Sequence, residues 1–244
     1  MPRFYCPTPL SPDQILALPA GTARHVQVLR AQPGDEITLF NGEGGEFTAT
    51  VTAMGRSEVS VQVGEHRAVE RELPLAVHLW VVMPANDRMD WLIEKAAELG
   101  AASVQPLMSA HSVLRLKADR AEKKREHWQA VAVGASEQCG RNQVMTIAPV
   151  LELGAALTAL PKVDTSSRRC LLSFRPDSVD LRSALNALPG LRSLCVLNGP
   201  EGGLNAQEEA AAVAQGFVPV QLGPRVLRAE TAPLAVLAAL PTLF

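Results

Sequence analysis

A glycine-rich segment of the chain, Leu197-Asn198-Gly199-Pro200-Glu201-Gly202-Gly203-Leu204, has the composition of a ligand-binding loop. It follows an apolar run and precedes a helical pattern. Loops that connect a strand to a helix lie at the carboxyl edge of a parallel sheet, where ligands bind. Glycine permits close backbone approach and positive φ, and Pro200 stiffens the turn. The carboxylate of Glu201 suits a cationic or hydroxyl-rich ligand. The alternative interpretation is an ordinary tight turn.

A second segment, Leu222-Gly223-Pro224-Arg225-Val226-Leu227-Arg228-Ala229-Glu230-Thr231-Ala232, also lies between a predicted strand and a predicted helix. Arg225 and Arg228 precede the helix, where the helix dipole disfavours cations, whereas Glu230 obeys the preference for acids. Cations placed in this way beside a glycine indicate binding of an anion or another ligand. A structural network of arginine and glutamate is the alternative.

A third polar segment, Ala135-Ser136-Glu137-Gln138-Cys139-Gly140-Arg141-Asn142, ends a long helical pattern. Gly140 is the expected residue beyond the helix end. Arg141 and Asn142 have side chains that bind phosphate or a base. The alternative is a helix C-terminus with a favourable cation.

Several common catalytic motifs are absent from the sequence. It contains no GxxxxGK[ST] phosphate loop, no GxGxxG dinucleotide fingerprint and no GxSxG nucleophile elbow. The five histidines lack metal-ligand spacing and no cysteine pair compensates, so we expect no metal site.

Residues 1–72 show the alternation of a small antiparallel sheet. Polar and apolar residues alternate over 36–40, 46–53 and 58–63, and glycine-containing turns separate these runs. Two short helices are predicted before them, one from Ser11-Pro12 and one from Thr22 to Arg30.

From Leu75 onward, apolar runs alternate with helical patterns. Strands are predicted at 77–82, 103–107, 170–174, 194–197 and 217–221. Helices are predicted at 87–99, 119–139, 178–188, 205–215 and 230–240, the first capped by Asp87. This alternation is typical of an α/β domain with a mainly parallel sheet. The sequence therefore predicts two domains, 1–72 and 73–244.

The composition indicates a folded, cytoplasmic protein. The 244 residues are 47% hydrophobic with a net charge of −2, so disorder and whole-molecule attraction to nucleic acid are not expected. The longest apolar stretch, Ala232–Phe244, is interrupted by prolines and is shorter than the ~18 residues of a membrane span. The N-terminus has no signal-peptide pattern, and the four cysteines are widely scattered, as in proteins with reduced thiols.

Taken together, the three polar segments resemble the bacterial 16S rRNA (uracil-N3)-methyltransferases of the SPOUT superfamily. The matching residues are Gly-Pro-Glu-Gly-Gly at 199–203, Leu-Gly-x-Arg-x-Leu-Arg-x-Glu-Thr-Ala at 222–232 and Ser-Glu-Gln-Cys-Gly-Arg at 136–141. Segments 24–35, 87–90 and 94–100 are also similar to the family, so the resemblance extends over nearly the whole chain.

The resemblance implies a fold and a cofactor. The fold is a small N-terminal PUA-like β-barrel domain followed by a C-terminal SPOUT α/β domain with a deep trefoil knot. The cofactor is S-adenosylmethionine, held by three loops. The residues that correspond to this site are Leu172, Gly199, Pro200, Glu201, Gly202, Gly203, Leu222, Gly223, Val226, Leu227 and Arg228.

The resemblance also implies methylation of uridine N3 in 16S rRNA, within the 30S subunit. It assigns catalysis to Arg228, with Arg141 second, and Glu230 either as base or as a residue that orients an arginine. The implied RNA contacts are Arg3, Arg24, Arg30 and Arg141. A homodimer is implied, in which the apolar C-terminal helix (Leu234, Val236, Leu237 and Leu240) forms either an interface or plain core.

The sequence departs from the family in two informative places. Asn198 stands where the family has an aliphatic residue, and it requires a hydrogen-bond partner if it is buried. Ala85-Asn86 replaces a Lys-Gly pair before Asp87, which removes one phosphate contact. Two other functions stay open: a related methyltransferase for another RNA, such as a tRNA ribose, and a non-catalytic RNA-binding or assembly factor.

Overall fold

The computed structural model describes residues 1–85, 88–162, 164–186 and 190–243, which form two compact units. The first unit contains Met1–Glu72 and Val133–Val144, and the second contains Leu73–Ala132 and Met145–Phe244. Residues 133–144 were assigned to the second domain by the sequence analysis, but they pack with the first unit. Asp87, the predicted helix cap, and residues 187–188 of another predicted helix lie outside the described part of the chain.

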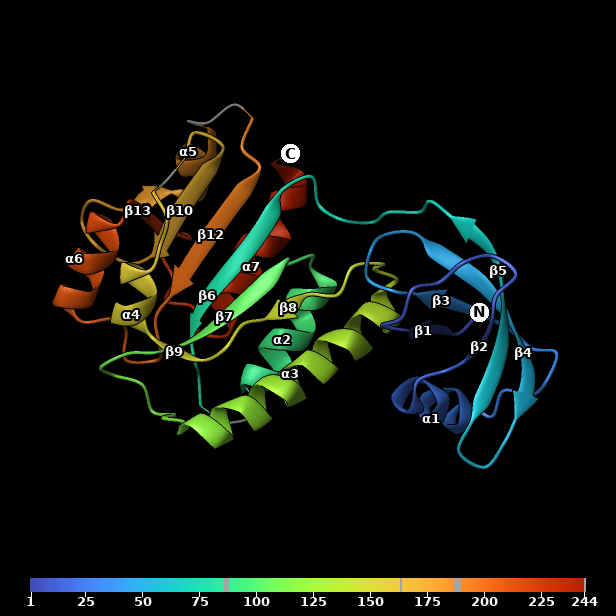
Figure 1. Cartoon of the computed structure of the whole chain (residues 1–244). Coiled ribbons are helices and arrows are strands. Elements are labelled where there is room, and N and C mark those ends of the chain that lie inside the picture. The colour runs from blue at the N-terminus through green and yellow to red at the C-terminus, as the bar shows by residue number, and fades with distance from the viewer. Residues whose placement is uncertain (86–87, 163, 187–189, 244) are drawn as a thin grey trace. The chain divides into compact units, whose positions relative to one another are not determined.

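The first unit contains a five-stranded sheet, one complete helix and the end of a longer helix over residues 133–139 (Figure 1). Its elements are β1 (Arg3–Tyr5), β2 (Ile15–Ala17), α1 (Ala20–Val28), β3 (Glu36–Phe40), β4 (Glu46–Met54) and β5 (Val59–Arg67). The strand order is β1-β3-β4-β5-β2, antiparallel except for the parallel pair β1–β3. The alternating apolar residues form its core, including Ile37, Leu39 and Val61.

The helix predicted from Ser11-Pro12 is wrong. Asp13 has a φ of 65°, a left-handed conformation that a helix does not contain. Its backbone N–H donates to the carbonyl of Val63, and residues 15–17 then pair with 60–62 of β5 as strand β2. Pairing with an available sheet edge outweighs the weak local helix signal.

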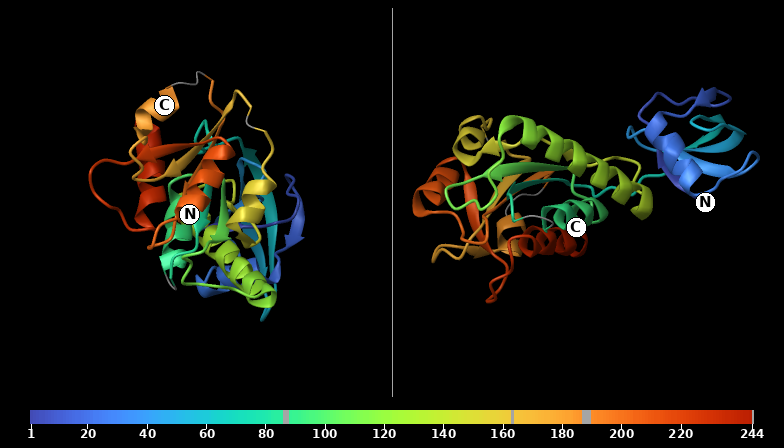
Figure 2. Two further views of the ribbon diagram at one scale, coloured as in Figure 1. Left: turned by 90° about the vertical axis from the view of Figure 1, so that its left-hand side faces the viewer. Right: turned by 90° about the horizontal axis from the view of Figure 1, so that it is seen from below.

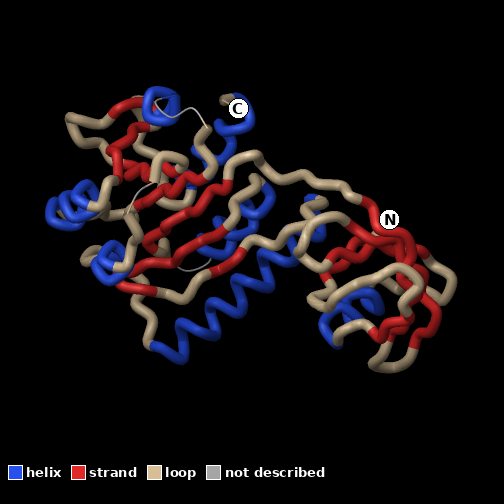
Figure 3. Tube along the Cα trace, turned by 45° about the horizontal axis from the view of Figure 1, so that its top comes forward, coloured by secondary structure: helices blue, strands red, loops and turns tan. Residues whose placement is uncertain are grey.

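The second unit is an eight-stranded parallel sheet with helices on both faces (Figures 2 and 3). Its strands are β6 (Ala76–Val82), β7 (Ser103–Met108), β8 (Thr146–Ile147), β9 (Leu151–Glu152), β10 (Ser167–Leu172), β11 (Val179–Asp180), β12 (Ser193–Asn198) and β13 (Phe217–Gln221). Its helices are α2 (Arg88–Glu98), α3 (Ala118–Cys139, divided between the units), α4 (Leu153–Thr158), α5 (Leu181–Asn186), α6 (Ala206–Ala214), α7 (Thr231–Ala239) and the 3₁₀ turn Leu240–Thr242.

The five long strands and the main helices of this unit match the predicted pattern. The two-residue strands β8, β9 and β11 and the six-residue helix α4 were not predicted, because elements this short carry no periodicity. Strand β10 ends at Leu172, two residues before the predicted end, so Ser173 and Phe174 belong to a loop.

Strand order brings four chain segments to one edge of the sheet. The order is β11-β13-β10-β12-β6-β7-β8, β9 also pairs with β7, and every pair is parallel. Leu172 lies opposite Val220, Leu171 opposite Leu197, and Leu197 opposite Trp80. The loops that follow β13, β10, β12 and β6 therefore leave the sheet side by side. Across the described residues, no helix is long and apolar enough to cross a membrane.

Candidate functional site

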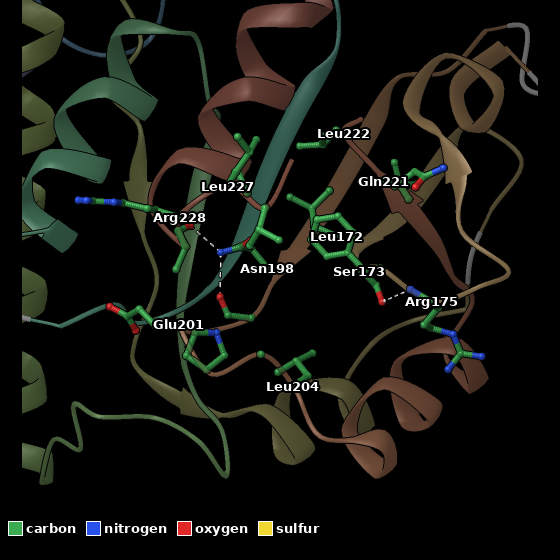
Figure 4. Close-up of a pocket in the computed structure, with 18 of the residues that line it drawn as sticks. Leu172, Ser173, Arg175, Asn198, Glu201, Leu204, Gln221, Leu222, Leu227 and Arg228 are labelled. Atoms are coloured by element: carbon green, nitrogen blue, oxygen red, sulfur yellow. Dashed lines mark hydrogen bonds between the residues drawn. The ribbon is translucent and has the colours of Figure 1, made fainter. Parts of the chain in front are cut away.

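A cavity of about 740 Å³ lies at this carboxyl edge, between the loops that follow β10, β12 and β13 and the start of α2 (Figure 4). Its lining includes nine of the eleven residues that the resemblance implies for the cofactor site. They are Leu172, Gly199, Pro200, Glu201, Gly203, Leu222, Val226, Leu227 and Arg228. Gly202 and Gly223 lie in the same loops but do not line the cavity. Three segments that are distant in sequence thus form one pocket.

Close backbone contacts and a turn hydrogen bond shape the loop after β12. A Cβ atom at Gly199 would come within 3.1 Å of the backbone nitrogen of Leu204, a tighter contact than Cβ atoms normally make, so any other residue would require the turn to shift. Gly203 has a φ of 70° and donates its N–H to the carbonyl of Pro200 at 2.9 Å. A capping box of Asn205 and Glu208 then starts α6. The pocket therefore has one preorganised wall.

Asn198 supplies the hydrogen bond that its burial requires. It is 4% exposed, and its side-chain amide donates to the carbonyl of Ala229 at 2.7 Å and to that of Gly199 at 3.0 Å. Because Ala229 belongs to the segment after β13, this amide joins two of the pocket loops (Figure 4).

Arg88, at the start of α2, joins the same two loops from another side. Its Nη1 donates to Oε1 of Glu201 at 3.0 Å, and its Nε lies 3.8 Å from Oε1 of Glu230. Glu230 is buried, and its other oxygen, Oε2, has no hydrogen-bond partner among the described residues. The arginine that Glu230 pairs with is therefore Arg88, which was not among the predicted site residues. The feature of the sequence that could have indicated Arg88 is a charged residue at the start of a helix that follows an apolar strand.

The loop after β10 contributes a second ion-paired corner of the pocket. The Ser173 hydroxyl donates to Glu209 at 2.8 Å and accepts from the backbone N–H of Arg175. The Arg175 guanidinium binds both oxygens of Asp177 and lies 3.9 Å from Glu209. None of these residues was selected as a site residue from the sequence, and Ser173 was assigned to the strand predicted to run through Phe174.

The electrostatics of the pocket favour an anion. Its carboxylates, Glu201 and Glu209, both face an arginine. In contrast, Arg225 and Arg228 are exposed on the loop after β13, and neither guanidinium has a partner within the described residues. The balance of unpaired charge at the pocket is therefore positive.

The cysteines within strands β10 and β12 do not line the pocket and are poor candidates for a nucleophile. Burial raises the pKa of the Cys170 thiol to about 12 and that of Cys195 to about 12. Both thiols stay protonated at neutral pH, and all four cysteines of the chain are free.

Arg141 lies in the first unit and does not line the pocket. It is 5% exposed, and its Nε donates to both carboxylate oxygens of Glu72 at 3.0 and 3.1 Å. Its neighbour Asn142 binds Arg3 at 2.6 Å and the carbonyl of Val69. This placement supports a structural role for the third polar segment, and the catalytic and RNA-binding roles of Arg141 stay predictions.

The other predicted RNA contacts differ in how accessible they are. Arg24 and Arg30 are exposed on and just after α1. Arg3 is largely buried, pairs with Glu46 and Asn142, and packs over the Phe40 ring at 5.1 Å. A phosphate has access to the first two arginines but competes with existing partners at Arg3.

The apolar C-terminal helix packs inside its own chain. Leu234, Val236, Leu237 and Leu240 are all at most 7% exposed in the single chain. Core packing therefore accounts for these four residues without a second copy, and a homodimer stays a prediction.

Comparisons with known proteins agree on one family. Residues 71–241 match an RNA methyltransferase domain, and residues 18–64 match an RNA methyltransferase PUA domain. A ribosomal RNA small subunit methyltransferase E from Bacillus subtilis is 35% identical over 88% of this chain and 84% of its own length. Solved structures with similar folds include that enzyme from Neisseria gonorrhoeae bound to S-adenosylmethionine (35% identity, TM-score 0.91, covering 100% of this chain and 98% of that one). A Legionella pneumophila methyltransferase with the same bound cofactor has 33% identity and a TM-score of 0.90, covering 98% of this chain and 96% of that one.

Proposed function

Because the chain belongs to the ribosomal RNA small subunit methyltransferase E family, we propose that it transfers a methyl group from S-adenosylmethionine to N3 of a uridine in 16S rRNA. The observation that carries this proposal is the pocket itself. Three loops that leave neighbouring parallel strands surround one cavity whose volume is typical of ligand sites.

The lining of the pocket fits this cofactor. Leu172, Leu222 and Leu227 offer apolar walls for an adenine ring, and Gly199 and Gly203 allow a ligand to approach the backbone closely. When bound, S-adenosylmethionine supplies an activated methyl group on a sulfonium centre.

The residues of the chain then have to prepare the acceptor. Uracil N3 is a neutral imide nitrogen and becomes a good nucleophile only when its N–H bond breaks and the proton leaves to bulk water. A guanidinium next to the ring stabilises the resulting negative charge, most strongly in a water-poor site. Arg228 lines the pocket without a carboxylate partner in the described chain, so we assign this role to it. Glu230 pairs with Arg88 and does not line the cavity, which favours an orienting role for Glu230 over that of a base.

We further propose that the substrate is the rRNA within the 30S subunit, that the first unit contacts it through Arg24 and Arg30, and that the enzyme acts as a homodimer in the cytoplasm. The exposure of both arginines and the PUA match support the RNA contact. The four free cysteines support the compartment.

The experiment that tests the function is methyl transfer from labelled S-adenosylmethionine to small subunits isolated from a strain that lacks this gene, followed by nucleoside analysis. We expect the label in 3-methyluridine. Arg228→Ala should abolish transfer while cofactor Kd stays within about tenfold, or ~1.4 kcal/mol. Label in another nucleoside would overturn the target. Cofactor binding without transfer to subunits or free 16S rRNA would favour a non-catalytic assembly factor.

A further inference from the structure

We infer that the mouth of the pocket binds one nucleotide of the RNA substrate, with its base stacked on Phe174 and its phosphate at Arg225; this inference rests on the function proposed above. Phe174 lines the pocket and is 59% exposed, although burying a phenylalanine ring is normally favourable by about 1.5–3 kcal/mol. An exposed ring at the rim of a pocket is available to a ligand.

The loop that carries Phe174 is fixed on both sides of the ring. The Ser173 N–H donates to the carbonyl of Val220 at 3.0 Å, and the Ser173 hydroxyl accepts from the N–H of Arg175 at 3.2 Å. Ser178 closes the loop by donating from its hydroxyl to the carbonyl of Ser173 at 3.1 Å. The side chain of Arg175 binds Asp177 and lies 3.9 Å from Glu209, and Figure 4 shows the hydrogen bond between the Arg175 N–H and the Ser173 hydroxyl. The ring is therefore presented from a preorganised backbone.

The loop after β13 completes the nucleotide site. Val226 is 82% exposed and lines the same cavity, so a second apolar side chain is available to a flat ring. Arg225, next to it, has no partner in the part of the chain that the structure describes. Apolar surface for a base beside an unpaired cation for a phosphate is the chemistry of a single-stranded nucleic acid site.

Phe174 lies at the exposed mouth of the pocket, and this position favours stacking of the RNA base on its ring over stacking of the cofactor adenine. The inner wall is formed by buried residues such as Asn198, Val220 and Ala229, whereas Phe174, Arg225 and Val226 are exposed. A target base must leave its RNA stack and enter from solution, so it meets the exposed residues first.

The test uses the full-length protein, S-adenosylmethionine and unmethylated small subunits. Phe174→Ala should raise KM for the subunits about tenfold, with kcat and cofactor Kd unchanged, since stacking on an aromatic ring contributes about 1–3 kcal/mol per base. Phe174→Tyr, which keeps the ring, should behave as wild type, and Phe174→Leu, which keeps only apolar volume, should not. Arg225→Ala should reduce the salt dependence of binding by about one phosphate contact. Val179→Ala, an exposed apolar change outside the pocket, is the matched control.

Three results would overturn the inference. One is a Phe174→Ala enzyme with wild-type KM, and another is a Phe174→Leu enzyme that cannot be distinguished from wild type. The third is a rise in cofactor Kd with unchanged KM for the subunits, which would place adenine on the ring. Failure of the wild-type protein to bind the cofactor or methylate RNA would instead reject the proposed function before any variant is compared.

Discussion

Replacing Arg88 by glutamine should loosen the pocket, because this one guanidinium serves carboxylates from two loops. Its 3.8 Å approach to Glu230 corresponds to about 1 kcal/mol at the dielectric constant of water and about 4 kcal/mol at an effective value of 20. The Glu230 side chain is 7% exposed but that of Arg88 is 42% exposed, so solvent screening applies to one partner. We therefore expect Arg88→Gln to lower the free energy of unfolding of the second unit by about 1–2 kcal/mol.

The assay follows from the positions of the tryptophans. Trp80, Trp91 and Trp128 are the three tryptophans of the chain, and all belong to the second unit, so their fluorescence during urea unfolding reports on that unit. In a double-mutant cycle, Glu230→Gln removes the buried charge that Arg88→Gln leaves unpaired. The double variant should therefore recover part of the loss, with a coupling energy of about 1 kcal/mol.

The double-mutant cycle has a control on the surface of α3. Arg125→Gln removes an exposed ion pair with Glu122 on α3 and should leave the unfolding curve unchanged. Additive effects of the Arg88 and Glu230 changes, within about 0.5 kcal/mol, would show that the two side chains are not coupled. A rise in cofactor Kd for Arg88→Gln is expected in parallel, since the arginine joins both loops that line the site.

Three further predictions follow from individual contacts. Asn198→Leu should destabilise the second unit by about 1–2 kcal/mol, because it leaves the carbonyl of Ala229 without its donor. Asn198→Asp should cost more, because a carboxylate would face two carbonyl oxygens. Unfolding followed by tryptophan fluorescence measures both effects, and a wild-type unfolding curve for Asn198→Leu would contradict the reasoning. Burial raises the pKa of Glu137, against the opposing effects of the Tyr5 N–H, His25 and Arg3, so the folded first unit holds this proton more tightly than the unfolded chain does. The stability that the bound proton on Glu137 contributes is present at low pH and is lost as the pH rises above the ordinary pKa near 4.5. Glu137→Gln should remove this loss. Hydrogen exchange in the first unit should therefore be slower in the variant than in wild type at pH 7, and equal in the two proteins at pH 4. Arg24→Ala and Arg30→Ala should each weaken RNA binding and flatten its salt dependence without changing stability. Arg3→Ala should instead destabilise the first unit, because of these three arginines only Arg3 is held by Glu46 and Asn142. Equal stability of the three variants would contradict this division.

The two pocket loops could be predicted because their signals are local. Each is a run of glycine, proline and charged residues that directly follows an apolar strand, and strand-to-helix loops of a parallel sheet share one edge. The helix expected from Ser11 failed for the complementary reason. Its local signal was weak, and the segment found a sheet edge in residues 60–62, which no window around Ser11 contains.

The third polar segment illustrates the limit of a motif. Ser136 to Arg141 was correctly read as the end of a long helix, but its surroundings depend on which unit that helix end packs with. Glu137 accepts from the backbone of Tyr5 and Arg141 binds Glu72, so the segment is built into the first unit. The residue type alone does not distinguish a buried structural arginine from an RNA-binding arginine, and only the groups that each arginine contacts do so. The trefoil knot implied by the resemblance is a property of the same kind, since it depends on how the chain is threaded and leaves no mark in periodicity.

Arg88 shows why the most informative residue of the pocket was missed. Its partner Glu201 is 113 positions away in the chain, and the contact exists because β12 lies next to β6 in the sheet, which brings the start of α2 beside the glycine-rich loop. Local pattern alone gives the strands but not their order, so it cannot say which strand-to-helix segments are neighbours. Once the order is known, a charged residue at the start of each helix on that edge becomes a candidate to face the pocket. Arg88 satisfies this rule, and its pairing with Glu201 joins the start of α2 to the loop after β12, so a single substitution at Arg88 should change the spacing between them.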